Sequence, residues 1–389
     1  MNAAKTPPGL SMTCLVFLLA LSCLAASAQA APPAGGAAST TTLAAVPIGI
    51  NMSEAEYSWG SFPSGDDLAY LKSNNISLIR VPIAWERAQP TLLGPLNSNY
   101  LSALKTFITA AAAQGMTVIV DVHNYGRYNV NWAADIASSG VATPGTGSGE
   151  FIIGSPTVPT AAFADLWTKL AGGLKGTPGL GYYDIMNEPN GMGSTWPTIA
   201  QAAVTAIRTV DTNTQILVPG TQWSSAFWWP GDNGSLYTVT DPANKILFEA
   251  HLYFDADGSG RYLQSYRTQG ATPTWGVEHV QPFLNWLTQH NAKGFLGEFG
   301  IPNNDPLWLP ILDNFLTTIQ AAGVSGTYWN YAFHSSSDPS WWPDTSDHMS
   351  IVTSPGFVQN NVQMPILSKH NTASSPTPAA PTGLTATVN

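Results

Sequence analysis

Two glutamates of this chain have the type and position needed for a pair of acid and base groups. Glu188 closes the run YYDIMNE and Glu298 closes the run GFLGE, and both runs are apolar enough to be buried strands. Cleavage of a glycosidic bond needs one carboxylic acid that protonates the leaving oxygen and one carboxylate that attacks the sugar or activates water. The pair therefore predicts glycosidic chemistry.

Side chains at the ends of other strands could separate the pKa values of these two carboxyls. Arg80, His251 and Tyr253 are candidates to donate hydrogen bonds to Glu298 and keep it ionised. Glu188 needs a less charged setting to hold its proton near neutral pH. Arg80 could instead be a structural ion-pair partner inside the fold, because such pairs are common.

Acidic residues also precede three of these strand-end residues by two or four positions along the chain. Because strand side chains alternate with a period of two, these carboxylates are expected in a layer beneath the site, where they could orient the residues above. The pairs are Asp121 below His123, Asp184 below Glu188 and Glu249 below His251.

The same side chains do not match a metal-binding pattern. Zinc hydrolases need three or four converging ligands, typically with a pair spaced H-x-H or H-E-x-x-H, and neither spacing occurs here. The acidic loop Asp255-Ala256-Asp257-Gly258 lacks the twelve-residue pattern and terminal Glu of a calcium loop. We therefore expect neither a metal nor another cofactor.

The tryptophans divide into two groups by position. Trp167 and Trp286 fall on apolar faces of expected helices and are assigned to the core. Others follow strands, where a flat ring could stack on the C–H face of a sugar, and Trp329, Trp223 and Trp59 are the best candidates for that contact. The tryptophans that fit substrate contact and loop packing equally well are Trp85, Trp228, Trp229, Trp341 and Trp342.

Eight short runs rich in β-branched and aromatic residues alternate with helical or looped sequence. Eight such repeats within residues 45–371 predict an α/β fold of the closed (β/α)8 TIM-barrel type. An open doubly wound sheet is the alternative, but no glycine-rich phosphate-binding turn follows the first run. The expected strands are 46–52, 77–83, 117–123, 181–188, 215–220, 246–253, 294–300 and 326–332.

Several segments between these strands have the apolar spacing of helices. Residues 100–108 and 163–174 show it ahead of Gly115 and Gly176, which are plausible helix ends. In a TIM barrel, active sites lie at the carboxyl ends of the strands. Further helices are expected at 199–210, 280–287 and 309–319.

The composition excludes two classes of protein. The chain is 11% aromatic but only 10% charged, against about 25% charged in a typical domain, and this combination excludes intrinsic disorder. A net charge of −10 argues against a nucleic-acid partner held through phosphates. Many aromatic rings with few charges suit a neutral, flat-faced ligand, and they equally suit a large core.

The N-terminal segment has the pattern of a secretory signal peptide. Residues 15–26 form an apolar run too short to span a membrane, and 28–30 supply an A-x-A cleavage site. Both cysteines lie inside residues 1–30, so no disulfide is expected in the mature protein. Residues 31–44 read as a flexible leader. We therefore expect a secreted protein, extracellular or periplasmic, without a membrane segment after cleavage.

The C-terminal segment is expected to leave the catalytic domain, residues 45–371. Residues 372–381 form a Pro/Ser/Thr/Ala-rich linker. Residues 382–389 alternate like a first strand, and APTGLTATVN resembles the opening of a fibronectin type III module.

Several blocks of the chain resemble glycoside hydrolase family 5, the cellulase family, and most closely its fungal-type endoglucanase subgroup. The resemblance runs from about Val46 to Ile366, and the insertion at 130–157 departs from it. The blocks that carry the resemblance are IRVPIAWERAQPT, VIVDVHNYGRY, YYDIMNEPNG, LVPGTQWSSAFWWP, HLYFDADGSG, FLGEFGIP and TYWNYAF.

The resemblance implies a role for each matched position. Glu298 would be the nucleophile, Glu188 the acid/base, Asn187 the partner of the sugar 2-hydroxyl, and Trp329 the floor of the −1 subsite. The supporting residues that it implies are Arg80 and Tyr253 beside the nucleophile, and His123 and His251 beside the sugar or the acid/base.

Together these features predict a secreted, monomeric, retaining endo-β-1,4-glucanase acting on cellulose-like glucans. Three alternatives stay open. One is a hydrolase of another β-polysaccharide such as mannan, xylan, xyloglucan or mixed-linkage glucan, because one barrel supports many specificities. The others are a non-catalytic glycan-binding barrel and a metal-dependent hydrolase.

Overall fold

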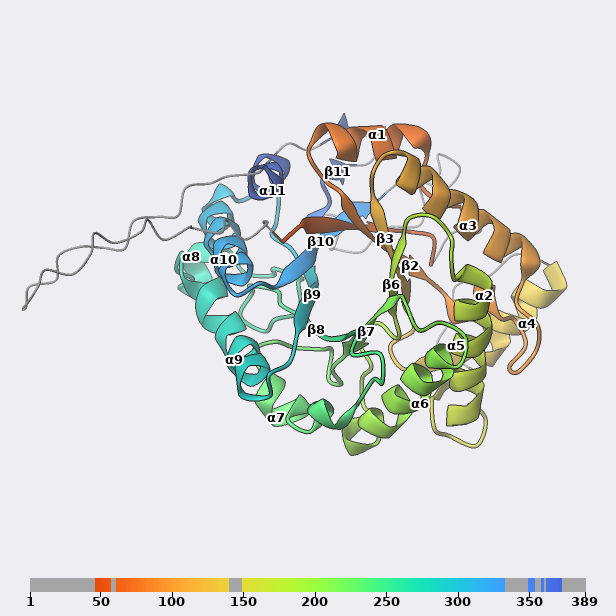
Figure 1. Ribbon diagram of the computed structural model, residues 1–389. Coiled ribbons are helices and arrows are strands. Elements are labelled where there is room, and N and C mark those ends of the chain that lie inside the picture. The colour runs from red at the N-terminus through yellow and green to blue at the C-terminus, as the bar shows by residue number, and fades with distance from the viewer. Residues whose placement is uncertain are drawn as a thin grey trace, which may run out of the picture. The chain divides into compact units, whose positions relative to one another are not determined.

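Eight parallel strands close into a barrel at the centre of the computed structural model, with helices around it (Figure 1). The structure describes residues 46–56, 61–139, 149–332, 349–353, 358–359 and 362–372. The predicted signal peptide, the leader, the terminal strand and all of the linker except Thr372 lie outside the described residues.

The strands of the barrel follow the order β1-β10-β9-β8-β7-β6-β3-β2, and all neighbours are parallel. This order confirms the predicted (β/α)8 TIM barrel, and the open doubly wound alternative is wrong. The barrel strands are β1 (Ile48–Ser53), β2 (Leu78–Ile83), β3 (Thr117–Val122), β6 (Leu180–Asp184), β7 (Gln215–Pro219), β8 (Ile246–His251), β9 (Gly294–Phe299) and β10 (Ser325–Ala332).

Strand β6 ends four residues earlier than predicted, at Asp184 instead of Glu188. The chain stays against the barrel, because the Asn187 N–H donates to Val122 O at 2.8 Å. It then turns sharply, since Glu188 has a φ of 40° and is followed by Pro189, which has no N–H for a ladder. Glu188 therefore lies on a turn above the strand rather than in it.

The helices follow the strands in alternation and form the ring around the barrel (Figure 1). All five predicted helices are present and each is extended at one or both ends, although α6 ends at Arg208, two residues before the predicted end. The α-helices are α1 (Gly65–Ser73), α2 (Trp85–Ala88), α3 (Ser98–Ala113), α4 (Val130–Ser139), α5 (Thr160–Leu174), α6 (Trp196–Arg208), α7 (Trp229–Asn233), α8 (Tyr266–Gln269), α9 (Trp275–Gln289), α10 (Leu309–Ala321) and α11 (Met364–Asn371); the 3-10 helices are η1 (Gly193–Thr195), η2 (Leu236–Thr238) and η3 (Pro306–Trp308).

Two short antiparallel pairs lie outside the barrel. Helix α4 and strand β5 lie in the described part of the insertion at 130–157, the segment that departs from the family resemblance, and β5 pairs with β4 just before it. The pairs are β4 (Arg127–Asn129) with β5 (Glu150–Ile152), and β11 (Val352–Thr353) with β12 (Val358–Gln359).

Local sequence explains the starts of two helices and their buried faces. Ser64 and Asp67 form a reciprocal capping box at the start of α1. Asn97 accepts from the first amides of α3, whose apolar spacing then buries one face against the barrel. Trp167 and Trp286 are buried, as their positions on α5 and α9 predicted. Helix α11 closes the domain, because Asn371 pairs with both the N–H and the C=O of Ile48 in β1.

The interior of the barrel is divided into layers along its axis. Leu78, Ile119, Leu217 and Phe295 form a buried apolar cluster at the amino ends of their strands. Two residues further along β2 and β3, Arg80 and Asp121 are charged and still fully buried, as is Glu249 on β8. These charged residues lie between the apolar core and the candidate site. Among the described residues, none of the helices is long and apolar enough to cross a membrane.

Candidate active site

Glu298, in the second-last position of β9, is held by three donors. Arg80 Nη1 lies 3.1 Å from its Oε1, Tyr253 Oη donates to its Oε2 at 2.7 Å, and His251 Nδ1 lies 3.5 Å from Oε2. Burial would raise the pKa of Glu298, but the charges of His251, Arg80 and His123 outweigh burial and lower it. An ionised Glu298 is a carboxylate available to attack.

Glu188 faces Glu298 from the turn after β6 and lies in a different electrostatic setting. Its side chain is 14% exposed, and its Oε1 lies 2.8 Å from His251 Nδ1. Burial raises the pKa of Glu188, and the charge of Glu298 raises it further against the opposing hydrogen bond from His251. The two carboxyls are thus pushed in opposite directions, which is how acid and base roles are separated in a shared site.

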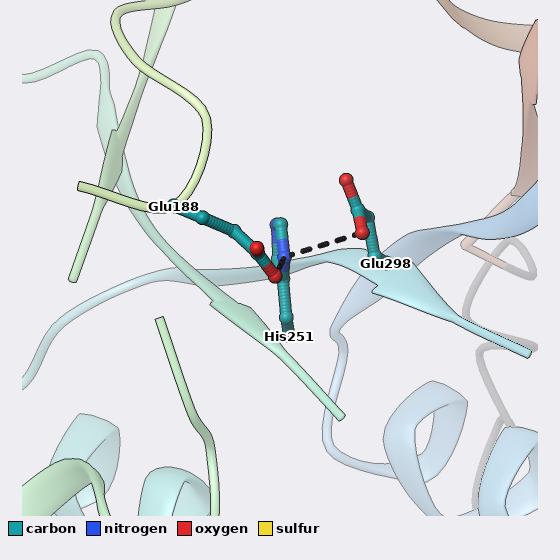
Figure 2. Close-up of side chains that lie close together, drawn as sticks. All are labelled: Glu188, His251 and Glu298. Atoms are coloured by element: carbon teal, nitrogen blue, oxygen red, sulfur yellow. Dashed lines mark hydrogen bonds and ion pairs between the residues drawn. The ribbon is translucent and has the colours of Figure 1, made fainter. Parts of the chain in front are cut away.

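His251 stands between the two glutamates (Figure 2). Its backbone is fixed to the loop after β7, since its N–H donates to Ser224 O at 2.8 Å and its C=O accepts from Ala226 N at 2.9 Å. Burial would lower the pKa of His251, but Glu298, Glu188 and Glu249 together raise it well above its usual range. A cationic His251 directs an N–H at the two glutamates.

Arg80 is the centre of the charged layer beneath the pair. It is fully buried and donates through all three of its nitrogens. Arg80 is therefore both an ion-pair partner of the buried aspartates and a direct contact of Glu298. Its partners are Asp184 at 2.8 Å, Asn51 at 2.9 Å, Asn187 at 2.9 Å, Asp121 at 3.1 Å, Glu298 at 3.1 Å and Glu249 at 3.5 Å.

Asn187, His123 and Trp329 form a connected group that Arg80 joins to Glu298. Arg80 donates to Asn187 Oδ1, so the amide nitrogen faces His123 Nε2 at 3.1 Å. His123 Nδ1 is held by Asp121 Oδ2 at 2.7 Å, and its ring stacks on Trp329 at 5.5 Å and 17°. Trp329 is 8% exposed, so it lies in the wall of the site rather than on the open surface.

Trp223 lies in the loop after β7 and is 50% exposed. Three successive residues there, Gln222, Trp223 and Ser224, have φ between 53° and 61°, a left-handed conformation that side chains rarely adopt. The ring contacts Tyr125 at 6.0 Å between centroids, and Tyr125 Oη lies 3.2 Å from His123 Nε2. The chain thus uses strained backbone to hold an exposed aromatic ring near the site.

The other tryptophans after strands separate by burial. Trp228 is 64% exposed, whereas Trp85 and Trp229 are fully buried and pack the loops. Trp59, the remaining sugar-contact candidate, lies outside the described residues together with Trp341 and Trp342.

Three residues of the site were missed by the sequence analysis. Asn51 bridges strands by accepting from Arg80 and donating to Gly297 O at 2.9 Å; a polar residue inside the apolar strand 46–52 was the available signal. Tyr125 follows His123 by two residues but lies beyond the strand. Glu86 fixes the loop that carries Tyr125, by accepting from Asn124 Nδ2 and Asn129 N, and burial raises its pKa to about 7.

Glu188, His251 and Glu298 are also the one group of three potential metal ligands among the described residues, with one atom of each within 4.8 Å of the others. The neighbouring carboxylates raise the pKa of His251, so a metal ion bound here would have to displace the imidazole proton.

Comparisons with known proteins identify the family of the chain. The family described as cellulase (glycosyl hydrolase family 5) matches residues 40–335. Endoglucanase 3 from Humicola insolens is 30% identical over 309 residues, covering 76% of this chain and 71% of that protein. Endoglucanase Cel5A from Pseudomonas stutzeri, solved with cellobiose, is 37% identical with a TM-score of 0.71, over 85% of this chain and 93% of that one. XacCel5A, solved with cellopentaose, is 30% identical with a TM-score of 0.68, over 84% and 100%.

Proposed function

The chain belongs to glycosyl hydrolase family 5 and is a glycoside hydrolase, and from this premise we propose that it is a secreted retaining endo-β-1,4-glucanase. Glu298 is the proposed nucleophile and Glu188 the proposed acid/base. The observation that carries the mechanism is the approach of the two carboxyls, since one oxygen of each lies within 4.8 Å of the other. Retaining enzymes hold their carboxyls about 5–5.5 Å apart and inverting enzymes about 6.5–9.5 Å.

In the proposed first step, Glu298 attacks the anomeric carbon and the glycosidic C–O bond breaks. The proton of Glu188 passes to the leaving oxygen, so the departing sugar leaves as a neutral alcohol. The N–H and O–H donors of Arg80 and Tyr253 orient the attacking carboxylate. His251 donates to Glu188 and stabilises the carboxylate that remains.

In the proposed second step, Glu188 acts as a base. It takes a proton from water, whose oxygen attacks the anomeric carbon and displaces Glu298 from the covalent intermediate. Two inversions at one carbon give net retention. Following the first-formed product by NMR tests this directly, because a β-glucan must release the β-anomer first, and the α-anomer as first product would contradict the double displacement.

The substrate class is proposed from the relatives, two of whose structures hold cellobiose and cellopentaose. A panel of soluble polysaccharides with reducing-end detection tests it. We expect the highest rate on carboxymethyl cellulose and mixed-linkage β-glucan, with falling viscosity showing internal cleavage. Faster release from mannan, xylan or xyloglucan would move the assignment to that polysaccharide, and cellulose binding with no reducing sugar released would favour the non-catalytic alternative.

Export, the domain boundaries and the monomeric state are proposed from the sequence. The A-x-A site at 28–30 places the mature terminus at residue 31. Mass spectrometry of the protein from a secreting host tests the cleavage, limited proteolysis tests the boundary at residues 372–381, and size-exclusion chromatography with light scattering tests the monomer. Retention of activity after chelation would remove the metal-dependent alternative.

A further inference from the structure

The strongest unassigned feature is a buried carboxylate directly below the catalytic pair. Glu249 lies on β8, fully buried, two residues before His251. Its Oε1 lies 3.7 Å from His251 Nε2 and 3.5 Å from Arg80 Nε. The imidazole of His251 therefore has a carboxylate at each ring nitrogen, with Glu188 and Glu298 at Nδ1 and Glu249 at Nε2.

The neighbouring strand β9 leaves room for this arrangement. A Cβ at Gly297 would lie 1.8 Å from Glu249 Oε1 and 2.7 Å from His251 Nε2, both far inside van der Waals contact. Gly297 immediately precedes Glu298, and its carbonyl is fixed by Asn51 Nδ2 at 2.9 Å and Thr327 Oγ1 at 2.6 Å. A side chain at this position would displace the carboxylate, the imidazole or both.

A second carboxyl, Asp184, completes the layer. Its Oδ2 accepts from Arg80 Nε at 2.8 Å. No N–H or O–H donor of the described residues is hydrogen-bonded to its Oδ1 or to either oxygen of Glu249, although all three oxygens are buried. Burial and the charge of Glu249 hold the pKa of Asp184 well above its usual range. Burial would likewise raise the pKa of Glu249, but Arg80 and His251 outweigh burial and lower it.

We propose that Glu249 is a positioning residue for the reaction, which keeps the His251 imidazole protonated and oriented toward Glu188, and that Asp184 shares one proton with it. The inference rests on the proposed function. Both carboxyls contact the same nitrogen, Arg80 Nε, at 2.8 Å from Asp184 and 3.5 Å from Glu249. Two buried carboxyls around one N–H repel each other when both are ionised, so one of them holds the proton. Glu249 remains the anion because it is the one that faces His251.

The consequence for catalysis is a chain of contacts from Glu249 through His251 to Glu188. A protonated Nδ1 donates to Glu188 and stabilises its carboxylate after the proton has left. Removing the charge of Glu249 removes the carboxylate beside His251 Nε2, so the imidazolium loses its proton more easily. The loss of activity should then be largest on substrates whose cleavage is limited by proton donation from Glu188.

The first test measures His251 directly, by NMR of the 15N-labelled imidazole against pH. The variants are Glu249→Gln, which removes the charge and keeps the shape, and Asp121→Asn, which removes a carboxylate of the same layer that contacts His123 instead. We expect the His251 pKa to fall by about 1–3 units in the first variant, the usual effect of losing a nearby carboxylate, and to stay unchanged in the second. An unchanged His251 titration in Glu249→Gln overturns the proposal.

The second test compares two substrates in the same variant. We expect cellulosic substrates to be cleaved about 10- to 100-fold more slowly by Glu249→Gln, the range seen when a partner behind a site residue is lost. An activated aryl cellobioside, whose leaving group needs no proton, should lose much less in its glycosylation step. An equal loss on both substrates would indicate a merely structural role and overturn the proposal.

A third variant covers the case in which Glu249→Gln fails to fold. Gly297→Ala keeps every charge but places its Cβ against Glu249 and His251, and it should give the same unequal loss on the two substrates. An equal loss there counts against the proposal. The NMR readout needs no activity, so a protein inactive on β-glucans would refute the proposed function while His251 could still be read.

Discussion

Two layers of the barrel interior lie two residues apart on the same strands, and one buries apolar side chains while the other buries charged ones. Leu78 and Ile119 belong to an apolar cluster at the amino ends of β2 and β3. Two residues further on, Arg80 and Asp121 are equally buried but form an ion pair at 3.1 Å. Both layers exclude water, so burial alone does not distinguish core from site.

The difference between the layers lies in what burial does to free energy. In the apolar layer, burial stabilises the fold by about 25 cal/mol per Å² removed from water. In the charged layer, burial costs several kcal/mol per ion, which the paired charges only partly recover. A barrel that places four carboxylates around one arginine therefore gains little stability from them, and it gains the separated pKa values of Glu188 and Glu298 instead.

The largest expected effect on the rate comes from replacing Glu298, the proposed nucleophile of the charged layer. Glu298→Gln removes the attacking carboxylate and keeps its shape, so we expect the rate on carboxymethyl cellulose to fall by at least about 10⁴-fold. The thermal midpoint, measured by circular dichroism, should change by a few degrees at most. Glu278→Gln on the exposed face of α9 is the control and should keep full activity, and a Glu298→Gln enzyme near the normal rate would end the assignment.

A paired substitution compares the two layers directly. Arg80→Met leaves buried carboxylates without their cation and should cost about 3–5 kcal/mol of stability, with activity lost. Leu217→Ala opens a cavity in the apolar cluster and should cost a similar amount, about 2–5 kcal/mol, with the rate per folded molecule unchanged. Urea unfolding and kcat on both variants check this, and loss of activity in folded Leu217→Ala would show that the layers are not separable.

The pH profile tests the opposed pKa shifts. Glu298 must be ionised and its pKa is lowered, so activity should be present above that pKa and fall as the pH drops through it. Glu188 must be protonated and its pKa is raised, so activity should fall as the pH rises through that higher value. We expect a bell-shaped plot of kcat/KM, in which each limb falls about tenfold per pH unit. Glu188→Gln should lose the alkaline limb on an activated aryl cellobioside, and persistence of that limb would assign it to another group.

The smallest expected effect is at the rim of the site. Trp223→Ala removes a half-exposed ring and should raise KM for soluble glucan about tenfold, equivalent to roughly 1.4 kcal/mol, with stability changed by less than about 0.5 kcal/mol. Trp229→Ala in the following helix should do the reverse, costing about 3–5 kcal/mol of stability with KM nearly unchanged. Equal KM values for Trp223→Ala and the unmodified enzyme would remove Trp223 from the substrate surface.

Local pattern was sufficient to predict the eight strands of the barrel and five of the helices around it. The strands are short runs rich in β-branched and aromatic residues, and each of the five predicted helices repeats its apolar residues on one face, so period and length identified them. The other described helices, such as α1 and α2, were not predicted. The errors lie at the ends. Strand β6 stops at Asp184, because the left-handed turn at Glu188 depends on contacts with β3 and not on the residues of the run alone.

Most candidate site residues were predictable because they lie at a strand end or shortly after one, whereas Tyr125 and Glu86 were missed. Arg80 and Glu298 follow from position, whereas Tyr125 reaches His123 only because Glu86 holds the intervening loop from α2. Trp223 and Trp229 are six residues apart, one in the loop after β7 and the other at the start of α7, yet the first is 50% exposed and the second fully buried. No local pattern distinguishes the two tryptophans, because Trp229 is buried by a tertiary contact with Phe283 of α9.

The sequence by itself determined which elements form, that eight of them alternate with helices, and that carboxyl, imidazole and guanidinium groups end the strands. These follow from side-chain period and residue type, which are local properties. Only the tertiary structure decided that Arg80 touches Asp184 and Glu298, 104 and 218 residues away, and that His251 lies between two glutamates. Electrostatic energy depends on distance through space, so opposite pKa shifts in two identical side chains arise only once the barrel has closed around them.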